Sequence, residues 1–277
     1  MSVHSAGMVM RTTVLYPERL NLYADRGNVL VLAQRCRRRG IAFELTTMHL
    51  GDTFGTTRPD LVYLGGGQDR DQRACGTDLL RHRETLAAAA AAGTTVLGIC
   101  GGFQLLGHEY VTADGTIPGL GLLDAVTTRR DRPRLVGNVV VEVTAAGMHA
   151  PPPLPAAARL TAAARLPAAA RLPAAARLPA SRLVGFENHQ GRTELGAGCQ
   201  PLGTVLVGAG NNGDDRLEGA VAGTVIGTYL HGPLLAKNAW FADQLIERAV
   251  GHALPPLVDR FADAVHLRAV EAALVTR

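Results

Sequence analysis

Aromatic residues are scarce in this sequence: Trp, Phe and Tyr together make up 4% of 277 residues. Proteins that bind single-stranded nucleic acid stack bases on aromatic side chains interleaved with basic ones, and no such interleaving occurs here. The formal net charge of +4 comes partly from arginines within the stretch 151–181, so it does not indicate a polyanionic partner. The composition therefore disfavours nucleic-acid binding.

Paired cysteines are also absent. The sequence has four cysteines and no C-x-x-C spacing: Cys36, Cys75, Cys100 and Cys199. This pattern argues against a zinc site and against a disulfide framework, and it favours reduced thiols. We expect no metal and no other cofactor in this chain.

Long apolar runs and a phosphate-binding loop are missing as well. No run of about 18 apolar residues occurs, and the first residues lack a leader-type pattern. We therefore expect a cytoplasmic protein without an integral membrane segment. The sequence contains no Gly-x-x-x-x-Gly-Lys motif, so ATP chemistry is not expected in this chain.

Strand and helix patterns alternate through the first part of the chain, which predicts an α/β fold with a mostly parallel sheet and helices on both faces. The expected strands are 12–16, 41–46, 61–64 and 94–99, and the expected helices are 26–39 and 77–92. Asp25 is expected to cap the first helix. Ligand sites in such sheets lie at the carboxyl ends of the strands.

Shorter β-type runs follow at 138–143, 183–186, 203–207 and 224–229, and they predict an antiparallel extension. The run 211–215, Asn-Asn-Gly-Asp-Asp, has the composition of a turn joining two antiparallel strands. Two helices are expected at the end, 237–250 and 257–275. The apolar stripe of the second, including Leu257, Phe261 and Val265, is expected to pack on its own domain.

One domain, residues 11–277, is predicted, preceded by a flexible stretch, 1–10. It is interrupted by 151–181, which contains the near-repeat Ala-Ala-Ala-Arg-Leu-Pro. Proline recurs there too often for a continuous helix, and large apolar residues are too few for a core. We expect this stretch to be a mostly disordered surface insertion.

The chain is organised around residues 94–107, where an apolar β-type run meets Cys100 and continues as a helical pattern. Glycines at positions 98, 101 and 102 remove the side chains that would clash where a strand turns sharply into a helix. A cysteine at a helix N-terminus has free N–H groups and the positive end of the helix dipole beside it, which favour a thiolate. Cys100 is therefore the candidate nucleophile.

A cysteine nucleophile needs a base, and nine histidines are available. His231 follows a predicted buried strand that could lie beside the strand leading to Cys100, so it is the first candidate. His189 is the alternative, although a role in ordering its loop or shaping a substrate site suits it better. The Gly65-Gly66-Gly67 loop follows another buried strand and lets backbone approach a ligand closely.

These motifs carry a family resemblance. Gly98-Ile99-Cys100-Gly101-Gly102-Phe103-Gln104, the triple-glycine loop and His231 resemble the triad-type glutamine amidotransferases. The segments 20–28, 185–189 and 227–233 are similar to the branch related to cobyric acid synthase, and within it to the glutaminase subunits of lipid II isoglutaminyl synthases. The likeness covers nearly the whole chain except the first ten residues and 151–181.

The resemblance implies a flavodoxin-like amidotransferase domain and a defined reaction. Cys100 would attack the side-chain amide of L-glutamine, and His231 would protonate the departing ammonia and later activate water. Backbone N–H groups of Gly66 and Gly101 would form the oxyanion hole, and Arg134 would bind the α-carboxylate of glutamine. Further substrate contacts are expected from Gly65, Gln104 and His189.

One position departs from the common pattern, because many of these enzymes carry an acid two residues after the histidine and this chain has Pro233 there. The resemblance implies that an aspartate of a partner subunit orients the imidazole, which would make the isolated chain a weak glutaminase. That partner would be a Mur-ligase-like synthetase, forming a heterodimer with this chain. It would bind ATP and metal, and would use the ammonia to amidate the D-glutamate α-carboxyl of lipid II in peptidoglycan synthesis.

Two other interpretations stay open. The same chemistry could feed another synthetase, such as one that amidates a cobyrinate-type ring. Alternatively, the chain could be a non-catalytic scaffold that keeps the fold, although packing alone requires neither Cys100 nor His231.

Overall fold

A computed structural model describes residues 7–144 and 182–275. The predicted insertion, 151–181, and most of the predicted flexible stretch lie outside the described residues, so these two expectations stay predictions. Residues 9 and 10 do not belong to a flexible end, because the first strand, β1, begins at Val9 and both residues lie in the central sheet.

A six-stranded sheet forms the centre of the molecule, with the order β13-β14-β4-β3-β1-β2. All neighbours pair in parallel except β13 with β14. The sheet confirms the predicted mostly parallel arrangement. Its strands are β1 (Val9–Leu15), β2 (Ala42–Met48), β3 (Leu61–Leu64), β4 (Thr95–Ile99), β13 (Ala220–Ala222) and β14 (Val225–Thr228).

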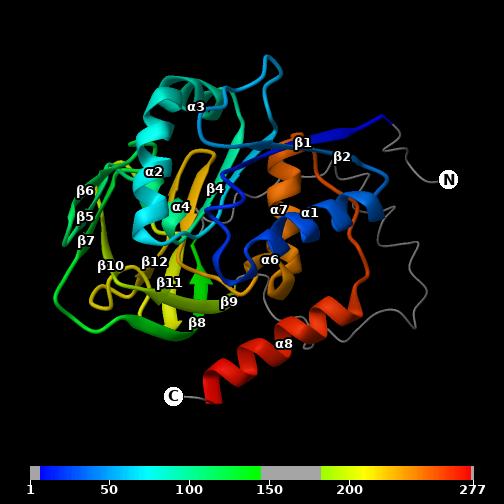
Figure 1. Ribbon diagram of the computed structural model, residues 1–277. Helices are drawn as coiled ribbons and strands as arrows, with labels where there is room; N and C mark the ends of the chain where they lie inside the picture. Colours follow the sequence, from blue (N-terminus) through cyan, green and yellow to red (C-terminus); the bar gives the residue numbers. More distant parts are fainter. Residues whose placement is uncertain (1–6, 145–181, 276–277) are drawn as a thin grey trace.

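Helices cover both faces of this sheet (Figure 1). On one side α1 (Arg26–Arg38) packs against α7 (Ala239–Val250), and on the other α2 (Asp69–Leu79) packs against α4 (Gly101–Leu106). Because both faces are covered, every residue of β3 and β4 is buried, which explains their continuous apolar sequences.

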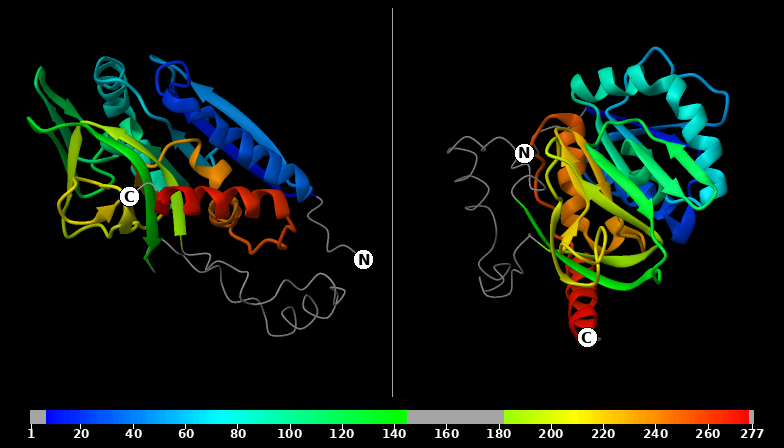
Figure 2. Two further views of the ribbon diagram at one scale, coloured as in Figure 1. Left: turned by 90° about the horizontal axis from the view of Figure 1, so that it is seen from below. Right: turned by 90° about the vertical axis from the view of Figure 1, so that its left-hand side faces the viewer.

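Two further four-stranded sheets lie beside the central one. One has the order β10-β7-β5-β6, and the other, β12-β11-β8-β9, is antiparallel throughout. The second sheet packs against α8 (Arg260–Val275), the red helix in Figure 2. The strands are β5 (Glu109–Thr112), β6 (Gly115–Pro118), β7 (Ala125–Arg129), β8 (Leu135–Val143), β9 (Arg182–His189), β10 (Gly191–Leu195), β11 (Gly203–Val207) and β12 (Leu217–Glu218).

One of the predicted helices needs correction, and another is confirmed. The predicted helix 77–92 begins earlier, as α2, and continues through η2 (Leu80–His82) into α3 (Arg83–Ala91). The predicted helix 237–250 is confirmed as α7, and a short helix, α6 (Leu234–Lys237), precedes it. Asn238 lies between the two, and its side chain bonds to Val184 of β9. Among the described helices none is both long and apolar enough to cross a membrane.

The apolar stripe predicted for the last helix is only partly buried. Phe261 is 79% exposed, whereas His266, Val270 and Ala273 form the face that is buried. The helix packs against α6, α7, β8 and β9, and the Phe261 side chain lies outside this packed surface.

The turn from β4 into α4 places Cys100 in a conformation that side chains rarely adopt, with φ 49° and ψ −101°. Strain of this kind is typical of a nucleophile between a strand and a helix. The turn also brings α4 so close to the sheet that a Cβ atom on Gly102 would lie 2.5 Å from the carbonyl oxygen of Leu64. Glycine at this position is therefore a packing requirement.

Gly102→Ala is expected to lower the free energy of unfolding by about 1–3 kcal/mol or more, because the added methyl group meets backbone that cannot move aside. Denaturant unfolding of both proteins measures the difference. Gly55→Ala is the matched control, since nothing lies within 4 Å of a Cβ atom there. Equal stability of the Gly102 variant and the wild type would show that the strand and helix are not this close.

Candidate functional site

Cys100 lies at the carboxyl end of β4, between the central sheet and α4. Its N–H donates to the carbonyl oxygen of Thr228 at 2.8 Å, which ties it to the end of β14. Its residue exposure is 6%. The neighbouring parallel strand therefore ends beside the thiol, and the chain leaving that strand leads to His231.

His231 is held between two sheets. Its backbone N–H donates to Phe186 of β9 at 2.8 Å, and its carbonyl oxygen accepts from the Phe186 N–H at 3.2 Å. The residue is completely buried. The predicted neighbourhood of β4 and β14 is thus confirmed, and the imidazole is fixed by both flanking sheets.

Asp25 contacts the imidazole from within the same chain. Its Oδ1 lies 3.2 Å from Nδ1 of His231, and both side chains are fully buried. Its Oδ2 accepts a hydrogen bond from the Gly66 N–H at 2.7 Å. Two expectations are corrected: the Asp25 side chain makes no helix-capping bond, and the carboxylate beside the histidine does not require a partner subunit.

A further set of hydrogen bonds holds Asp25 in place. The Tyr63 hydroxyl donates to the Asp25 carbonyl oxygen at 3.1 Å and accepts from Asn28 Nδ2 at 2.9 Å. Asn28 Oδ1 in turn accepts from the Leu235 N–H at 2.8 Å, four residues after the histidine. The carboxylate and the imidazole are therefore positioned by one shared buried network.

The charges at this site favour a protonated imidazole. Burial alone would lower the pKa of His231, but the Asp25 carboxylate and the Cys100 thiol beside it outweigh burial and raise the pKa to about 10. His231 is therefore charged near neutral pH, and can give a proton to a leaving group on the side away from Asp25.

Gly66 lies where the three side chains meet. A Cβ atom on it would be 2.8 Å from His231 Cε1, 3.0 Å from Asp25 Oδ2 and 3.5 Å from Cys100 Cβ. Its N–H, expected in an oxyanion hole, is committed to Asp25 instead. Within the described residues the N–H groups of Gly67 and Gly101 have no partner, and a Cβ atom on Gly101 would lie 2.7 Å from the Gly67 nitrogen.

Arg134 lies at the start of β8 and does not contact Cys100. It donates to the side-chain and main-chain oxygens of Asn188 at 2.8 and 2.9 Å. Asn188 Nδ2 donates to the Tyr23 hydroxyl at 2.7 Å. The Tyr23 ring packs edge-on against the His231 ring, with centroids 4.9 Å apart. Arg134 is thus connected to the buried site through two side chains.

Gln104 and His189 meet at one buried ring rather than at an open pocket. Gln104 Nε2 donates to the Tyr229 hydroxyl at 3.1 Å, and the His189 ring stacks on Tyr229 with centroids 3.6 Å apart. Burial lowers the pKa of His189, whose Nδ1 pairs with the Gly191 carbonyl oxygen at 2.8 Å. The predicted substrate residue Gly65 is also packed, because a Cβ atom there would lie 2.1 Å from the Leu20 carbonyl oxygen.

Sequence reasoning missed Asp25, Tyr23 and Glu218. Glu218 is fully buried and accepts hydrogen bonds from Thr228 and the Tyr229 N–H, and burial raises the pKa of its carboxyl to about 7. A usable signal existed for the first two, because the loop 16–25 follows the carboxyl end of β1 just as the triple-glycine loop follows β3. No local pattern marked Glu218.

The site places the Cys100 thiol beside the His231 imidazole, and the imidazole beside the Asp25 carboxylate. These three groups are the set needed for nucleophilic acyl transfer. Across residues 7–144 and 182–275, no group of three or more His, Cys, Asp or Glu side chains is placed to hold a metal ion.

The sequence of this chain is similar to those of known glutamine amidotransferases. The family model for the CobB/CobQ-like glutamine amidotransferase domain matches residues 11–239. A relative from Staphylococcus aureus (strain N315), "Lipid II isoglutaminyl synthase (glutamine-hydrolyzing) subunit GatD", is 36% identical over 235 residues, covering 84% of this chain and 81% of the relative.

Two further relatives are also more than 30% identical to this chain. The subunit of the same name from Streptococcus pneumoniae (strain ATCC BAA-255 / R6) is 32% identical over 237 residues, covering 85% of this chain and 78% of the relative. A cobyric acid synthase from Pelotomaculum thermopropionicum (strain DSM 13744 / JCM 10971 / SI) is 35% identical over 195 residues, covering 66% of this chain and 31% of that enzyme.

Proposed function

The chain belongs to the CobB/CobQ-like glutamine amidotransferase family, and from this membership we propose that it is the glutaminase subunit of a lipid II isoglutaminyl synthase. It is an enzyme that hydrolyses glutamine. The observation that carries the proposal is the identity of 36% and 32% to two subunits of that name across most of both chains.

Cys100 is the proposed nucleophile and His231 the proposed general acid and base. The Cys100 sulfur attacks the side-chain carbonyl carbon of glutamine, and the C–N bond breaks as the imidazolium gives its proton to the leaving ammonia. The neutral imidazole then takes a proton from water, which attacks the thioester and releases glutamate. Asp25 keeps the imidazole in one orientation and stabilises its charge.

Two backbone N–H groups are proposed to hold the oxyanion. Gly101 supplies one from the N-terminus of α4, as the sequence indicates, and Gly67 supplies the other in place of Gly66. Both are free of partners in the described part of the chain, and the two residues approach each other closely beside Cys100. Such donors stabilise charge that develops only in the transition state.

Arg134 is proposed to bind the α-carboxylate of glutamine, since a guanidinium can grip a carboxylate through two hydrogen bonds. Arg134 bonds to Asn188, Asn188 bonds to Tyr23, and the Tyr23 ring packs against His231; this connection to the site supports the role.

Arg134→Gln is expected to raise the KM for glutamine by about 10- to 100-fold and to leave kcat within a few fold, because a charged hydrogen bond to substrate contributes about 1.5–3 kcal/mol. Steady-state glutaminase kinetics measure both constants. Arg129→Gln is the control, since Arg129 belongs to the same arginine-rich run and pairs with Asp69 on the surface. An unchanged KM in the Arg134 variant would contradict the assignment.

The proposed partner is a separate Mur-ligase-like synthetase subunit in the cytoplasm. It would carry ATP and metal, activate the D-glutamate α-carboxyl of lipid II, and receive the ammonia released here. The printed names of the two relatives, each a subunit of a synthase, support a partner of this kind.

Glutamine-dependent amidation of lipid II tests the function. The purified chain is combined with its candidate synthetase subunit, ATP, lipid II and glutamine, and the product is analysed by mass spectrometry. Conversion of glutamate to isoglutamine in the stem peptide is expected, with one glutamate released per amide formed. Stable assembly with a cobyrinate-amidating synthetase instead would favour the role suggested by the cobyric acid synthase relative.

A further inference from the structure

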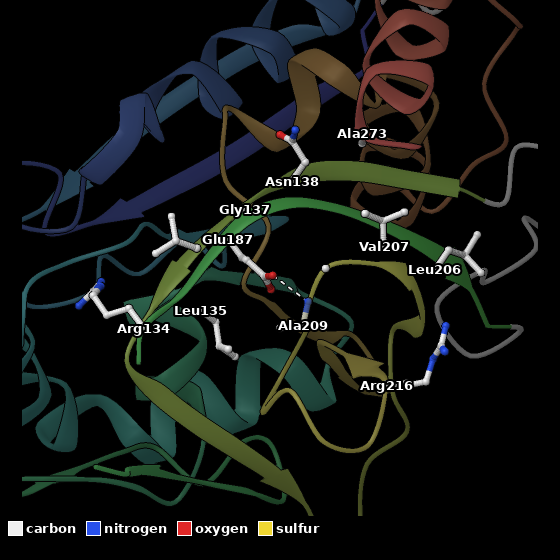
Figure 3. Close-up of a pocket in the computed structure, with 12 residues that line it drawn as sticks. Arg134, Leu135, Gly137, Asn138, Glu187, Leu206, Val207, Ala209, Arg216 and Ala273 are labelled. Carbon is white, nitrogen blue, oxygen red and sulfur yellow. Dashed lines mark hydrogen bonds between the residues drawn. The ribbon is translucent and has the colours of Figure 1, made fainter. Parts of the chain in front are cut away.

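A groove with a volume of about 880 Å³ runs along β8 on the side away from β9 (Figure 3). Its floor is the segment 135–138 of β8, and its far wall is the chain from Leu206 to Ala209. Arg134 and Arg216 stand at its opposite ends in Figure 3. Of the residues that line this groove, only Arg134 takes part in the chemistry proposed above.

The groove exists because β11 covers only part of β8. The residues of β11 pair with positions 140–143 of β8, and the chain then turns away at Gly208, which has a φ of 98°. Both carboxylate oxygens of Glu187 hold the departing loop, accepting from the N–H groups of Ala209 at 2.8 Å and Gly210 at 2.9 Å. Positions 135–139 therefore have a strand on one side only.

The direction of the free backbone groups follows from the pairing of β9. Phe186 exchanges both of its backbone hydrogen bonds with His231, so its N–H and C=O point away from β8. Its opposite residue on β8, Asn138, must then point its own N–H and C=O away from β9, towards the far wall of the groove, where a Cβ atom on Gly208 would lie 3.0 Å from the Asn138 carbonyl oxygen. Because backbone direction in a strand repeats every two residues, the N–H and C=O of Val136 also point away from β9. Within the described residues, the backbone groups of Val136 and Asn138 make no backbone hydrogen bond.

This edge lacks the features that normally protect an exposed strand. The sequence Leu135-Val136-Gly137-Asn138-Val139 contains no proline and no charged residue, and Val136 is 58% exposed. The charged side chains that line the groove are Arg134 and Arg216 at its ends and Glu187, whose carboxylate oxygens accept hydrogen bonds from the loop, so positive charge is in excess. An extended segment with carboxylate side chains complements both the backbone and the charge.

We propose that the free edge of β8, residues 135–139, is the docking site for an acidic, extended segment of the synthetase subunit, which adds to the sheet as a further strand. This inference rests on the proposed function for the existence of that subunit. The position suits a regulatory contact, because Arg134 at the end of the groove donates to Asn188, and Asn188 donates to the hydroxyl of Tyr23, whose ring packs edge-on against His231.

Val136→Pro tests the proposal, because it removes an N–H that faces the groove and leaves the bonds to β9 intact. Val136→Thr is the matched control, since threonine keeps the N–H and the branched shape. Titration calorimetry of the full chain with the purified synthetase subunit is expected to show Kd raised at least about tenfold by proline and by less than about threefold by threonine. Glutamine hydrolysis by the isolated chain is expected to stay unchanged in both.

Arg216→Glu provides a second test that does not alter the strand. It is expected to raise Kd by at least about fivefold, while Arg216→Lys has little effect. In the wild-type complex, amide hydrogen exchange of the segment 135–139 is expected to slow relative to the free chain.

The outcomes separate this inference from the proposed function. If the wild type binds the synthetase subunit and Val136→Pro, Arg216→Glu and the exchange of 135–139 all show no effect, the docking site is overturned and the proposed function stands. If the wild type does not bind the subunit, both are overturned. Self-association of the free chain that Val136→Pro abolishes would assign the edge to a second copy and overturn the proposed occupant.

Discussion

Replacing Asp25 with asparagine is expected to lower glutamine hydrolysis by the isolated chain by about 10³- to 10⁴-fold, which corresponds to about 4–5.5 kcal/mol of transition-state stabilisation. The asparagine side chain has nearly the same shape but no charge. It can neither hold the protonated ring nor specify which ring nitrogen faces Cys100. The rate of glutamate release, with folding verified by circular dichroism, measures the effect.

The protonation of His231 supplies a readout that a purely structural role would not affect. Without the carboxylate, burial is opposed only by Cys100, so the pKa of His231 is expected to fall from about 10. A group whose pKa is raised by folding stabilises the protein fully below its unfolded pKa, and that contribution is lost as the pH rises through the folded pKa. The Asp25 variant should therefore lose stability most clearly near and below neutral pH, and an NMR titration of the ring follows the shift.

A second Asp–His pair in the same chain provides the control. Asp124 Oδ1 lies 3.0 Å from His108 Nε2 at the surface, where both side chains are at least 40% exposed. Asp124→Asn should leave hydrolysis unchanged. If Asp25→Asn also leaves hydrolysis unchanged, the orienting acid comes from elsewhere, and a carboxylate of the partner subunit becomes the leading candidate again.

Cys100→Ala is expected to reduce glutamine hydrolysis by about 10⁵-fold or more and to abolish covalent labelling by a glutamine-analogue electrophile. No other group at the site can form the thioester, so the residual rate reflects only binding and polarisation of the amide. Glutamate release and the mass of the labelled protein measure the two effects. Ammonium-dependent synthesis by the complex should survive, because it bypasses the glutaminase step.

Cys199→Ala is the matched control for this prediction, since Cys199 has the same exposure of 6% as Cys100 but lies away from His231. Burial raises the pKa of the Cys199 thiol, which keeps it unreactive. Full activity or unchanged labelling in Cys100→Ala would show that Cys100 is not the nucleophile. Failure of the electrophile to label Cys100 of the wild type, even with the partner subunit present, would favour the non-catalytic scaffold.

The features predicted best from the sequence are those that depend on a few residues next to one another in the chain. Two continuous apolar runs became β3 and β4, and the glycines around Cys100 indicated the sharp turn that the structure contains. The turn at 211–215 also joins two antiparallel strands as expected. By contrast, β5, β6 and β7 were missed because strands this short carry too little alternation to stand out.

Side-chain direction explains the errors at the site. Asp25 precedes a helix, and the position alone favours capping, but the helix begins where the carboxylate turns inward towards Gly66 and His231. The contact joins residues 206 positions apart, and no periodicity encodes a pairing over that separation. Gln104 and His189 were assigned to substrate for the same reason, since only the fold shows that Tyr229 lies between them.

The separation of Asp25 and His231 also has a consequence for biosynthesis. A ribosome adds about 5–20 residues per second, so His231 is added to the growing chain about 10–40 seconds after Asp25. Cys100 joins the growing chain partway through that interval, before its base has been made. A prematurely terminated product that ends before His231 would therefore be unable to hydrolyse glutamine, and hydrolysis begins only after His231 has been added to the chain.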